Sequence, residues 1–171
     1  MSETNISEIL DGMSNELISR FDMSQNASED QPLMIGIHTG GVWVAEALHK
    51  RMNLKNPLGT LNISFYRDDF TRIGMHPQVL PSQIPGSVEG KHIILVDDVL
   101  YTGRTIRAAI NEIFDYGRPG SITLATLIER DGRELPVQAD VVGVHMKLEE
   151  HQQVKLNGPD PLTWSVEGGT P

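Results

Sequence analysis

The residues best suited to chemistry lie in one short stretch, IILVDDVLYTGRT, at positions 93–105. Four apolar residues are followed directly by Asp97 and Asp98, and a Thr-Gly-Arg-Thr sequence comes shortly after them. An apolar run of this kind is typical of a buried strand, and Gly103 allows a tight turn into a helix. The stretch therefore predicts a strand, a polar turn and a helix N-terminus in immediate succession.

A helix N-terminus in that position is suited to a phosphate group. The first backbone N–H groups of a helix have no partner within it, and the helix dipole places partial positive charge there. The hydroxyls of Thr102 and Thr105 can donate to phosphate oxygens or cap the helix. The two carboxylates would repel a phosphate unless ribose hydroxyls or Mg²⁺ lie between them. Together these groups indicate a sugar phosphate that carries further phosphates.

The composition restricts the class of protein. The chain has 171 residues, no Cys, and a net charge of −9 from 14 basic and 23 acidic residues. This length suits one domain that needs no disulfides, and the lack of Cys excludes thiolate metal sites and Cys nucleophiles. The acidic balance disfavours non-specific nucleic-acid binding. No apolar run is long enough to span a membrane and no signal peptide is visible, so we expect a cytoplasmic protein.

The apolar pattern along the chain predicts alternating strands and helices. The expected elements are a helix within 4–23, strands at 33–37, 58–66, 92–96, 121–128 and 140–146, helices after residues 41 and 105, and a polar tail at about 149–171 with short edge strands. This order predicts a single α/β domain over 1–171, with a mostly parallel twisted sheet flanked by helices. A Pro-rich stretch at about residues 66–90 is expected to form a flexible loop.

Three polar turns, 38–41, 97–105 and 129–133, would then follow the carboxyl ends of strands, where ligands bind in such sheets. The plainer interpretation of the 93–105 stretch is a buried strand followed by a capped helix with two solvated acids.

Several of these segments resemble a known family. IILVDDVLYTGRT resembles the motif that binds phosphoribosyl pyrophosphate (PRPP) in type I phosphoribosyltransferases. SFYRDDF, FDYGRP and RELP resemble more narrowly the pyrimidine-operon attenuator/uracil phosphoribosyltransferase family. The resemblance covers 33–145, and the P-loop and dinucleotide-binding signatures are absent from the sequence.

The resemblance implies a phosphoribosyltransferase, of the glycosyltransferase class, that converts uracil and PRPP into UMP and pyrophosphate with Mg²⁺. It implies catalytic roles for Asp97, Asp98 and Arg67, and Mg²⁺ held by the two aspartates directly or through water. The residues implied to bind PRPP and its phosphate are Asp97, Asp98, Tyr101, Thr102, Gly103, Arg104 and Thr105.

Three further segments receive roles from the same resemblance. The pyrophosphate loop is His38, Thr39, Gly40 and Gly41; the hood that closes over PRPP is Tyr66, Arg67, Asp68 and Asp69; Arg130 and Val154 frame the base. Many relatives carry Lys or Arg in the pyrophosphate loop, so a neutral imidazole here predicts weaker and pH-dependent pyrophosphate binding. The plainer alternatives are an ordinary strand-to-helix turn for the pyrophosphate loop, a solvated charge run for the hood, and a plain loop for the region expected to frame the base.

Two functions remain open on the sequence. The first is the uracil phosphoribosyltransferase reaction, UMP-responsive regulation of pyrimidine genes, or both. The alternative is a catalytically weak regulator that senses nucleotides and binds RNA or another partner. The net charge of −9 disfavours RNA. A metal phosphohydrolase fits least, because further ligands and a nucleophile are missing from the pattern. Relatives form dimers and tetramers, so the resemblance also implies a homo-oligomer.

Overall fold

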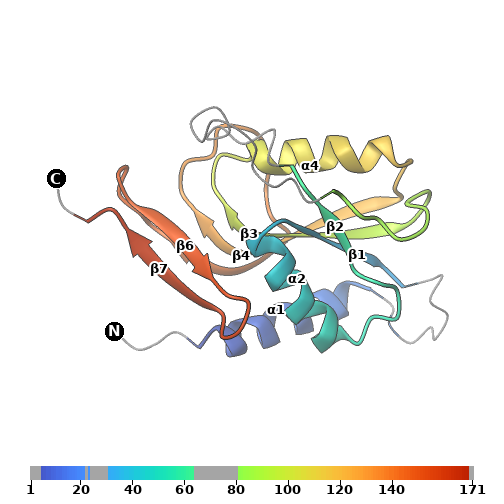
Figure 1. The fold of residues 1–171 in the computed structure, drawn as a ribbon, viewed down its shortest axis with the longest axis horizontal. Helices are drawn as coiled ribbons and strands as arrows, with labels where there is room; N and C mark the ends of the chain where they lie inside the picture. Colours follow the sequence, from blue (N-terminus) through green and yellow to red (C-terminus); the bar gives the residue numbers. More distant parts are fainter. Residues whose placement is uncertain (1–4, 22, 24–30, 64–80, 170–171) are drawn as a thin grey trace.

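The computed structural model describes residues 5–21, 23, 31–63 and 81–169 (Figure 1). Its helices are α1 (Ile6–Arg20), α2 (Gly40–Met52) and α4 (Arg104–Asp115), and its strands are β1 (Leu33–Ile37), β2 (Gly59–Leu61), β3 (His92–Leu100), β4 (Ser121–Arg130), β5 (Val141–Met146), β6 (Gln153–Asn157) and β7 (Thr163–Glu167). None of the helices within these ranges is long and apolar enough to cross a membrane.

Five strands form one parallel sheet in the order β2-β1-β3-β4-β5. This confirms the α/β fold with a parallel sheet flanked by helices. The chain runs outward from β1 to β2 and then returns to the other side of β1 with β3. The strand order therefore reverses between β1 and β3, and the carboxyl ends of these two strands are where such a sheet leaves room for a ligand.

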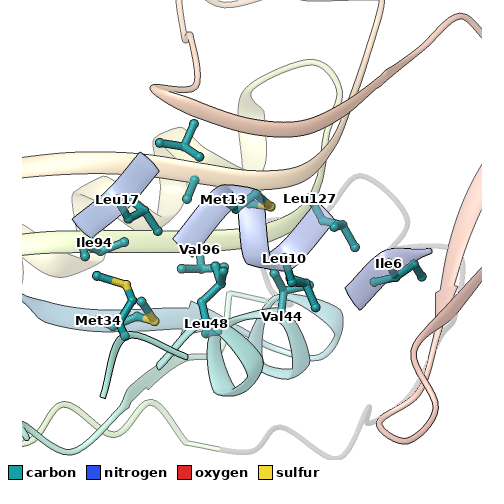
Figure 2. Close-up of a cluster of buried hydrophobic side chains, with 14 of the residues drawn as sticks. Ile6, Leu10, Met13, Leu17, Met34, Val44, Leu48, Ile94, Val96 and Leu127 are labelled. Carbon is teal, nitrogen blue, oxygen red and sulfur yellow. The ribbon is translucent and has the colours of Figure 1, made fainter. Parts of the chain in front are cut away.

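Helices cover both faces of the sheet, with α1 and α2 on one face and α4 on the other (Figure 1). Alternate residues of β3 enter opposite cores: Ile94 and Val96 pack with α1 and α2, whereas Ile93 and Leu95 pack with α4. Figure 2 shows the first core, where apolar side chains of both helices meet β3. Because both faces are covered, the central strands are apolar along their length rather than alternating.

Strand β3 is longer than its apolar run predicts. It continues through Asp97 and Asp98 to Leu100, because β4 continues beside it and pairs Asp97 with Thr126 and Leu100 with Glu129. The expectation that the two aspartates follow the end of the strand is therefore wrong by a few residues. Both lie inside the strand near its C-terminal end, where Asp97 and Val99 pair with β4 on either side of Asp98.

The C-terminal strands do not extend the main sheet as edge strands. β6 and β7 pair antiparallel with each other and form a separate ribbon, which projects beyond the sheet (Figure 1). Leu156 of the ribbon is buried and belongs to the α1–α2 core, and Trp43 of α2 packs against the same core. Amphipathic alternation predicts a strand but not the strand with which it pairs.

Removing the Leu17 side chain tests the packing of α1. Leu17 is fully buried in the first core, to which Leu48 of α2 and Val96 of β3 also belong. Leu17→Ala should lower the free energy of unfolding by about 2–4 kcal/mol, as measured by urea denaturation, because a cavity remains at a well-packed position. The exposed neighbour Asn15 provides the control, and Asn15→Ala should change the stability by less than about 0.5 kcal/mol. Equal effects of the two variants would contradict the packing of α1 on the sheet.

Candidate functional site

The turn after β1 and the acidic pair on β3 lie in direct contact. Gly40 and Gly41 open α2, and a Cβ on Gly40 would overlap the Asp98 carboxylate. A Cβ on Gly41 would lie 2.8 Å from the carbonyl oxygen of Val96 and 3.1 Å from Asp97 Cα. Only glycine allows the N-terminus of α2 to approach β3 this closely. The structure thus brings together two of the three turns that the sequence places at strand ends.

The two aspartates differ in their surroundings. Asp97 is 2 % exposed, whereas Asp98 is half-buried. Asp97 Oδ1 accepts from the N–H of Asp98 at 2.9 Å, and Asp98 Oδ1 accepts from the N–H of Val99 at 2.9 Å. Each carboxylate is oriented by the main chain next to it, which leaves Asp98 the more accessible acid for a ligand hydroxyl.

A turn of three residues, Tyr101, Thr102 and Gly103, joins β3 to α4; we call it the phosphate turn. Gly103 has a φ of 94°, a left-handed conformation that favours glycine, and it is the N-cap of α4. It offers no side-chain cap, while Thr102 Oγ1 accepts from the N–H of Arg104 at 3.2 Å. The hydroxyl of Thr102 thus takes the capping role, and its proton still allows it to donate.

The segment after β4 packs on the phosphate turn. The N–H groups of Glu134 and Leu135 both donate to the carbonyl of Thr102, at 3.0 and 3.1 Å. Val137 lies against Gly103, where a Cβ would be 3.2 Å from its side chain. The segment that directly follows the third polar turn therefore packs on the second. Sequence reasoning missed these contacts, since the only local signal is the Gly132 turn ahead of them.

Arg130, predicted to frame the base, is almost entirely buried. It is 7 % exposed, its guanidinium lies 4.1 Å from the centre of the Tyr101 ring, and Nη1 donates to the carbonyl of Gln152 at 3.0 Å. These contacts connect the end of β4 to the phosphate turn and to the start of the ribbon. Val154 lies on that ribbon and packs against the first core. Their role in base binding stays a prediction.

The predicted hood residues Tyr66, Arg67, Asp68 and Asp69 lie outside the described residues. The chain that follows them is anchored on α4: Ser82 Oγ accepts from the N–H of Asn62 at 2.9 Å and donates to Glu112 Oε1 at 2.5 Å. Asn62, which directly follows β2, and Ser82 are thus bonded to each other.

The acidic pair matches the donors that Mg²⁺ needs. Among the described residues, no group of three His, Cys, Asp or Glu side chains could enclose a metal ion. Mg²⁺ is ordinarily held by one or two carboxylates together with waters and substrate phosphates. Asp97 and Asp98 beside a phosphate turn provide such a donor set, so the residues fit a metal that arrives with a phosphorylated ligand.

His38, the first residue of the predicted pyrophosphate loop, is held by the end of β2. Its N–H donates to the carbonyl of Leu61 at 2.9 Å. Burial lowers the pKa of its imidazole below 6.5, and the Glu46 carboxylate opposes that change. The ring is therefore neutral at pH 7, so this loop offers a pyrophosphate group an uncharged imidazole and backbone N–H groups.

The sequence and the fold match known phosphoribosyltransferases. Residues 5–158 match the family model described as phosphoribosyl transferase domain. A hypoxanthine-guanine phosphoribosyltransferase from Bacillus anthracis superposes with a TM-score of 0.67 at 18 % identity, over 85 % of this chain and 82 % of that one. The hypoxanthine phosphoribosyltransferase of Trypanosoma cruzi gives a TM-score of 0.66 at 21 % identity, over 85 % and 79 %. These structures share the fold of a phosphoribosyltransferase.

Curated relatives define the family more narrowly. The bifunctional protein PyrR of Nitrosococcus oceani is 69 % identical over 140 residues, which cover 81 % of this chain and 79 % of the relative. The bifunctional protein PyrR of Pseudomonas aeruginosa is 53 % identical over 162 residues, 95 % and 94 % of the two chains. The chain therefore belongs to the phosphoribosyltransferase family and, within it, to the bifunctional PyrR proteins.

The lowered pKa of His38 predicts a pH dependence of stability. Between the folded pKa and 6.5 the unfolded chain binds more protons than the folded one, so stability rises with pH through this window and is lost as pH falls. His38→Asn should remove this component. Urea unfolding of both proteins between about pH 5 and about pH 7.5 should show that the free energy of unfolding falls more steeply towards acid in the wild type than in His38→Asn. Parallel curves would show that His38 is not desolvated.

Gly40→Ala should disturb the acidic pair more than the fold. The new methyl group overlaps the Asp98 carboxylate, so the Asp98 side chain must move away from its present position. We expect phosphoribosyltransferase activity to fall by about 10-fold or more, while the stability falls by less than about 2 kcal/mol. Gly12→Ala is the control, since a Cβ on Gly12 of α1 meets nothing within 4 Å. Steady-state rates and urea unfolding of both variants provide the measurement; unchanged activity of Gly40→Ala would contradict the contact.

Proposed function

We propose that this protein transfers the 5-phosphoribosyl group of PRPP to uracil, forming UMP and releasing pyrophosphate. One observation carries the proposal: the Asp97–Asp98 pair lies between the N-terminus of α2 and the phosphate turn at the N-terminus of α4. A single place thus offers backbone N–H groups to a phosphate at two helix N-termini, with two carboxylates between them. PRPP is a sugar with a phosphate at one end and a pyrophosphate at the other, so its charges match this order.

In this reaction, different residues would bind different parts of PRPP. The phosphate turn, Arg104 and Thr105 bind the 5′-phosphate, and the two aspartates accept hydrogen bonds from the ribose hydroxyls. The bond between C1′ and the pyrophosphate oxygen breaks, the bond between C1′ and uracil N1 forms, and the N1 proton leaves. Positive charge develops on the ribose ring as the leaving group departs, and the nearby carboxylates stabilise it. Bound Mg²⁺ would offset the charge of the leaving pyrophosphate.

The remaining predicted roles complete the site. His38, Thr39, Gly40 and Gly41 would bind pyrophosphate through backbone N–H groups at the start of α2. Tyr66, Arg67, Asp68 and Asp69 would close over PRPP and exclude water, with Arg67 in contact with the phosphates. Arg130 and Val154 would border the base. The cytoplasmic location expected from the sequence stays a prediction.

A second function is favoured by the pyrophosphate loop and by the relatives. The loop holds a neutral His38 and no Lys or Arg, so it would bind pyrophosphate more weakly than a cationic loop. The relatives are named bifunctional. We therefore also propose a regulator of pyrimidine genes that responds to UMP, acts as a homodimer or tetramer, and binds RNA or another partner. With a net charge of −9, RNA contact would have to be confined to a small basic surface.

Turnover with single bases tests the proposal. Protein, PRPP and Mg²⁺ mixed with each nucleobase in turn should yield nucleotide with uracil. Asp97→Asn should lower kcat/KM by about 100-fold or more, because the neutral amide keeps the acceptor for the Asp98 N–H but loses the charge. Asp115→Asn is the control, since Asp115 is an exposed acid at the far end of α4 and should leave the rate unchanged.

Two outcomes would contradict the enzymatic proposal. Full turnover of Asp97→Asn would remove the acidic pair from the reaction. No nucleotide with any base, together with tight UMP binding by the wild-type protein, would leave the regulatory function alone.

A further inference from the structure

The carbonyl groups of the phosphate turn are held from outside by the segment that follows β4. Arg133 Nη1 donates to the carbonyl oxygen of Tyr101. The N–H groups of Glu134 and Leu135 donate to the next carbonyl, that of Thr102, at 3.0 and 3.1 Å. Two successive peptide groups ahead of α4 are therefore bound by one short segment of chain.

Holding these carbonyls also orients the N–H groups that a phosphate would use. A peptide group is planar and trans, so its C=O and N–H point in opposite directions and turn together. The carbonyl of Tyr101 shares its plane with the N–H of Thr102, and the carbonyl of Thr102 shares its plane with the N–H of Gly103. Gly103 would otherwise leave this backbone with unusual freedom, because it has no Cβ. The bonds to the carbonyls restrict both N–H groups to one direction.

Glu129 holds Arg133 in the position that makes the first of these bonds. The Arg133 guanidinium bridges two acceptors, since Nη2 pairs with Glu129 Oε1 at 2.5 Å while Nη1 binds the Tyr101 carbonyl. Glu129 Oε2 lies 2.8 Å from His145 Nδ1, so the carboxylate is fixed from its other side. The Glu129 side chain is 16 % exposed and that of Arg133 is 26 % exposed. A planar guanidinium can make two such bonds at once, which a lysine ammonium on a flexible stem cannot reproduce.

The neighbouring ion pair between Arg104 and Glu134 is more exposed than the Glu129–Arg133 pair. Arg104 and Glu134 pair at 2.9 Å, but their side chains are 51 % and 54 % exposed. Exposed pairs of this kind contribute little, because water screens them and both side chains lose freedom. The Glu129–Arg133 pair is both more buried and bonded to the main chain of the turn.

We propose that Glu129 and Arg133 are positioning residues that pre-orient the backbone N–H groups of the phosphate turn for the 5′-phosphate of PRPP. This rests on the proposed function, and it adds a pair that acts through the Tyr101 carbonyl without touching the reacting atoms. Loosening the turn weakens binding of the phosphorylated donor, whereas the acids and the base site keep their geometry.

Steady-state kinetics of Glu129→Gln test this directly. The amide is nearly isosteric but holds the guanidinium less strongly. We expect KM for PRPP to rise about 5- to 20-fold, with kcat changed by less than about 3-fold and KM for uracil by less than about 2-fold. A merely structural role would instead lower the amount of active protein and leave KM for PRPP unchanged, and that result would overturn the proposal.

A double-mutant cycle tests whether Glu129 acts through Arg133. Arg133→Met should raise KM for PRPP at least as much as Glu129→Gln, and adding Glu129→Gln to it should have little further effect. Arg133→Lys should behave like Arg133→Met, because a single ammonium nitrogen does not reproduce the two separate donor nitrogens of the guanidinium plane. Additive effects, or wild-type kinetics for Arg133→Lys, would show that charge or direct ligand contact matters instead, and either would refute the positioning role.

The chain offers a matched control on α1. Glu16 and Arg20 have the same spacing, pair at 3.6 Å, and Arg20 Nη2 likewise donates to a main-chain carbonyl, that of Asp140, at 3.0 Å. Glu16→Gln should therefore leave KM for PRPP unchanged. Hydrogen exchange without any ligand gives an independent readout: amides of residues 102–106 should exchange about 5-fold faster in Glu129→Gln and at the wild-type rate in Glu16→Gln.

The experiments distinguish loss of the proposed reaction from loss of the positioning role. A wild-type protein without turnover would remove the proposed reaction, yet the exchange rates would still report whether Glu129 orders the turn. A wild-type enzyme with normal turnover, combined with unchanged kinetics and exchange in Glu129→Gln, would overturn the positioning role alone.

Discussion

The close approach of the α2 N-terminus to β3 is the constraint on which the site depends. A carboxylate is costly to remove from water unless its oxygens are bonded, and Asp97 is 2 % exposed. It is held there because β3 and β4 extend past their apolar cores and because Gly40 and Gly41 leave no side chain above the pair. A Cβ at Gly36 would likewise lie 2.9 Å from Ala45 and from the Val42 backbone, so three glycines bring β1, α2 and β3 together.

Most of the fold could be predicted from the sequence, because its signals are local. The apolar runs of β1 and β3 determine elements by themselves, and the alternation of strands and helices predicts a parallel sheet. The end of β3 could not be predicted, since the strand continues through two aspartates only because β4 lies alongside. The pairing of β6 with β7 was missed for the same reason: pairing is a property of two segments that no single segment contains.

Part of the candidate site could likewise be predicted from local sequence signals, and part could not. The aspartates, the Gly103 turn and the glycine-rich loop were recognisable because each needs particular residue types in a row. The burial of Arg130 against the Tyr101 ring and the bridge from Arg133 to the Tyr101 carbonyl were not recognisable, because each joins residues about 30 positions apart. Any residue can present a carbonyl, so such a contact leaves no signature in the residue type at Tyr101.

The separate ribbon of β6 and β7 has a consequence for how this scaffold can change. It shares no ladder with the main sheet. Leu156 is buried in the first core, and Val154, Leu162 and Trp164 pack against that core. Arg130, at the end of β4, donates to the carbonyl of Gln152 just before the ribbon. Replacements at its exposed positions, such as Val166, disturb neither the parallel ladder nor the glycine contacts. Substitutions on the exposed side of the ribbon can therefore accumulate during evolution or laboratory selection, while the parallel sheet and the glycine contacts between α2 and β3 are kept.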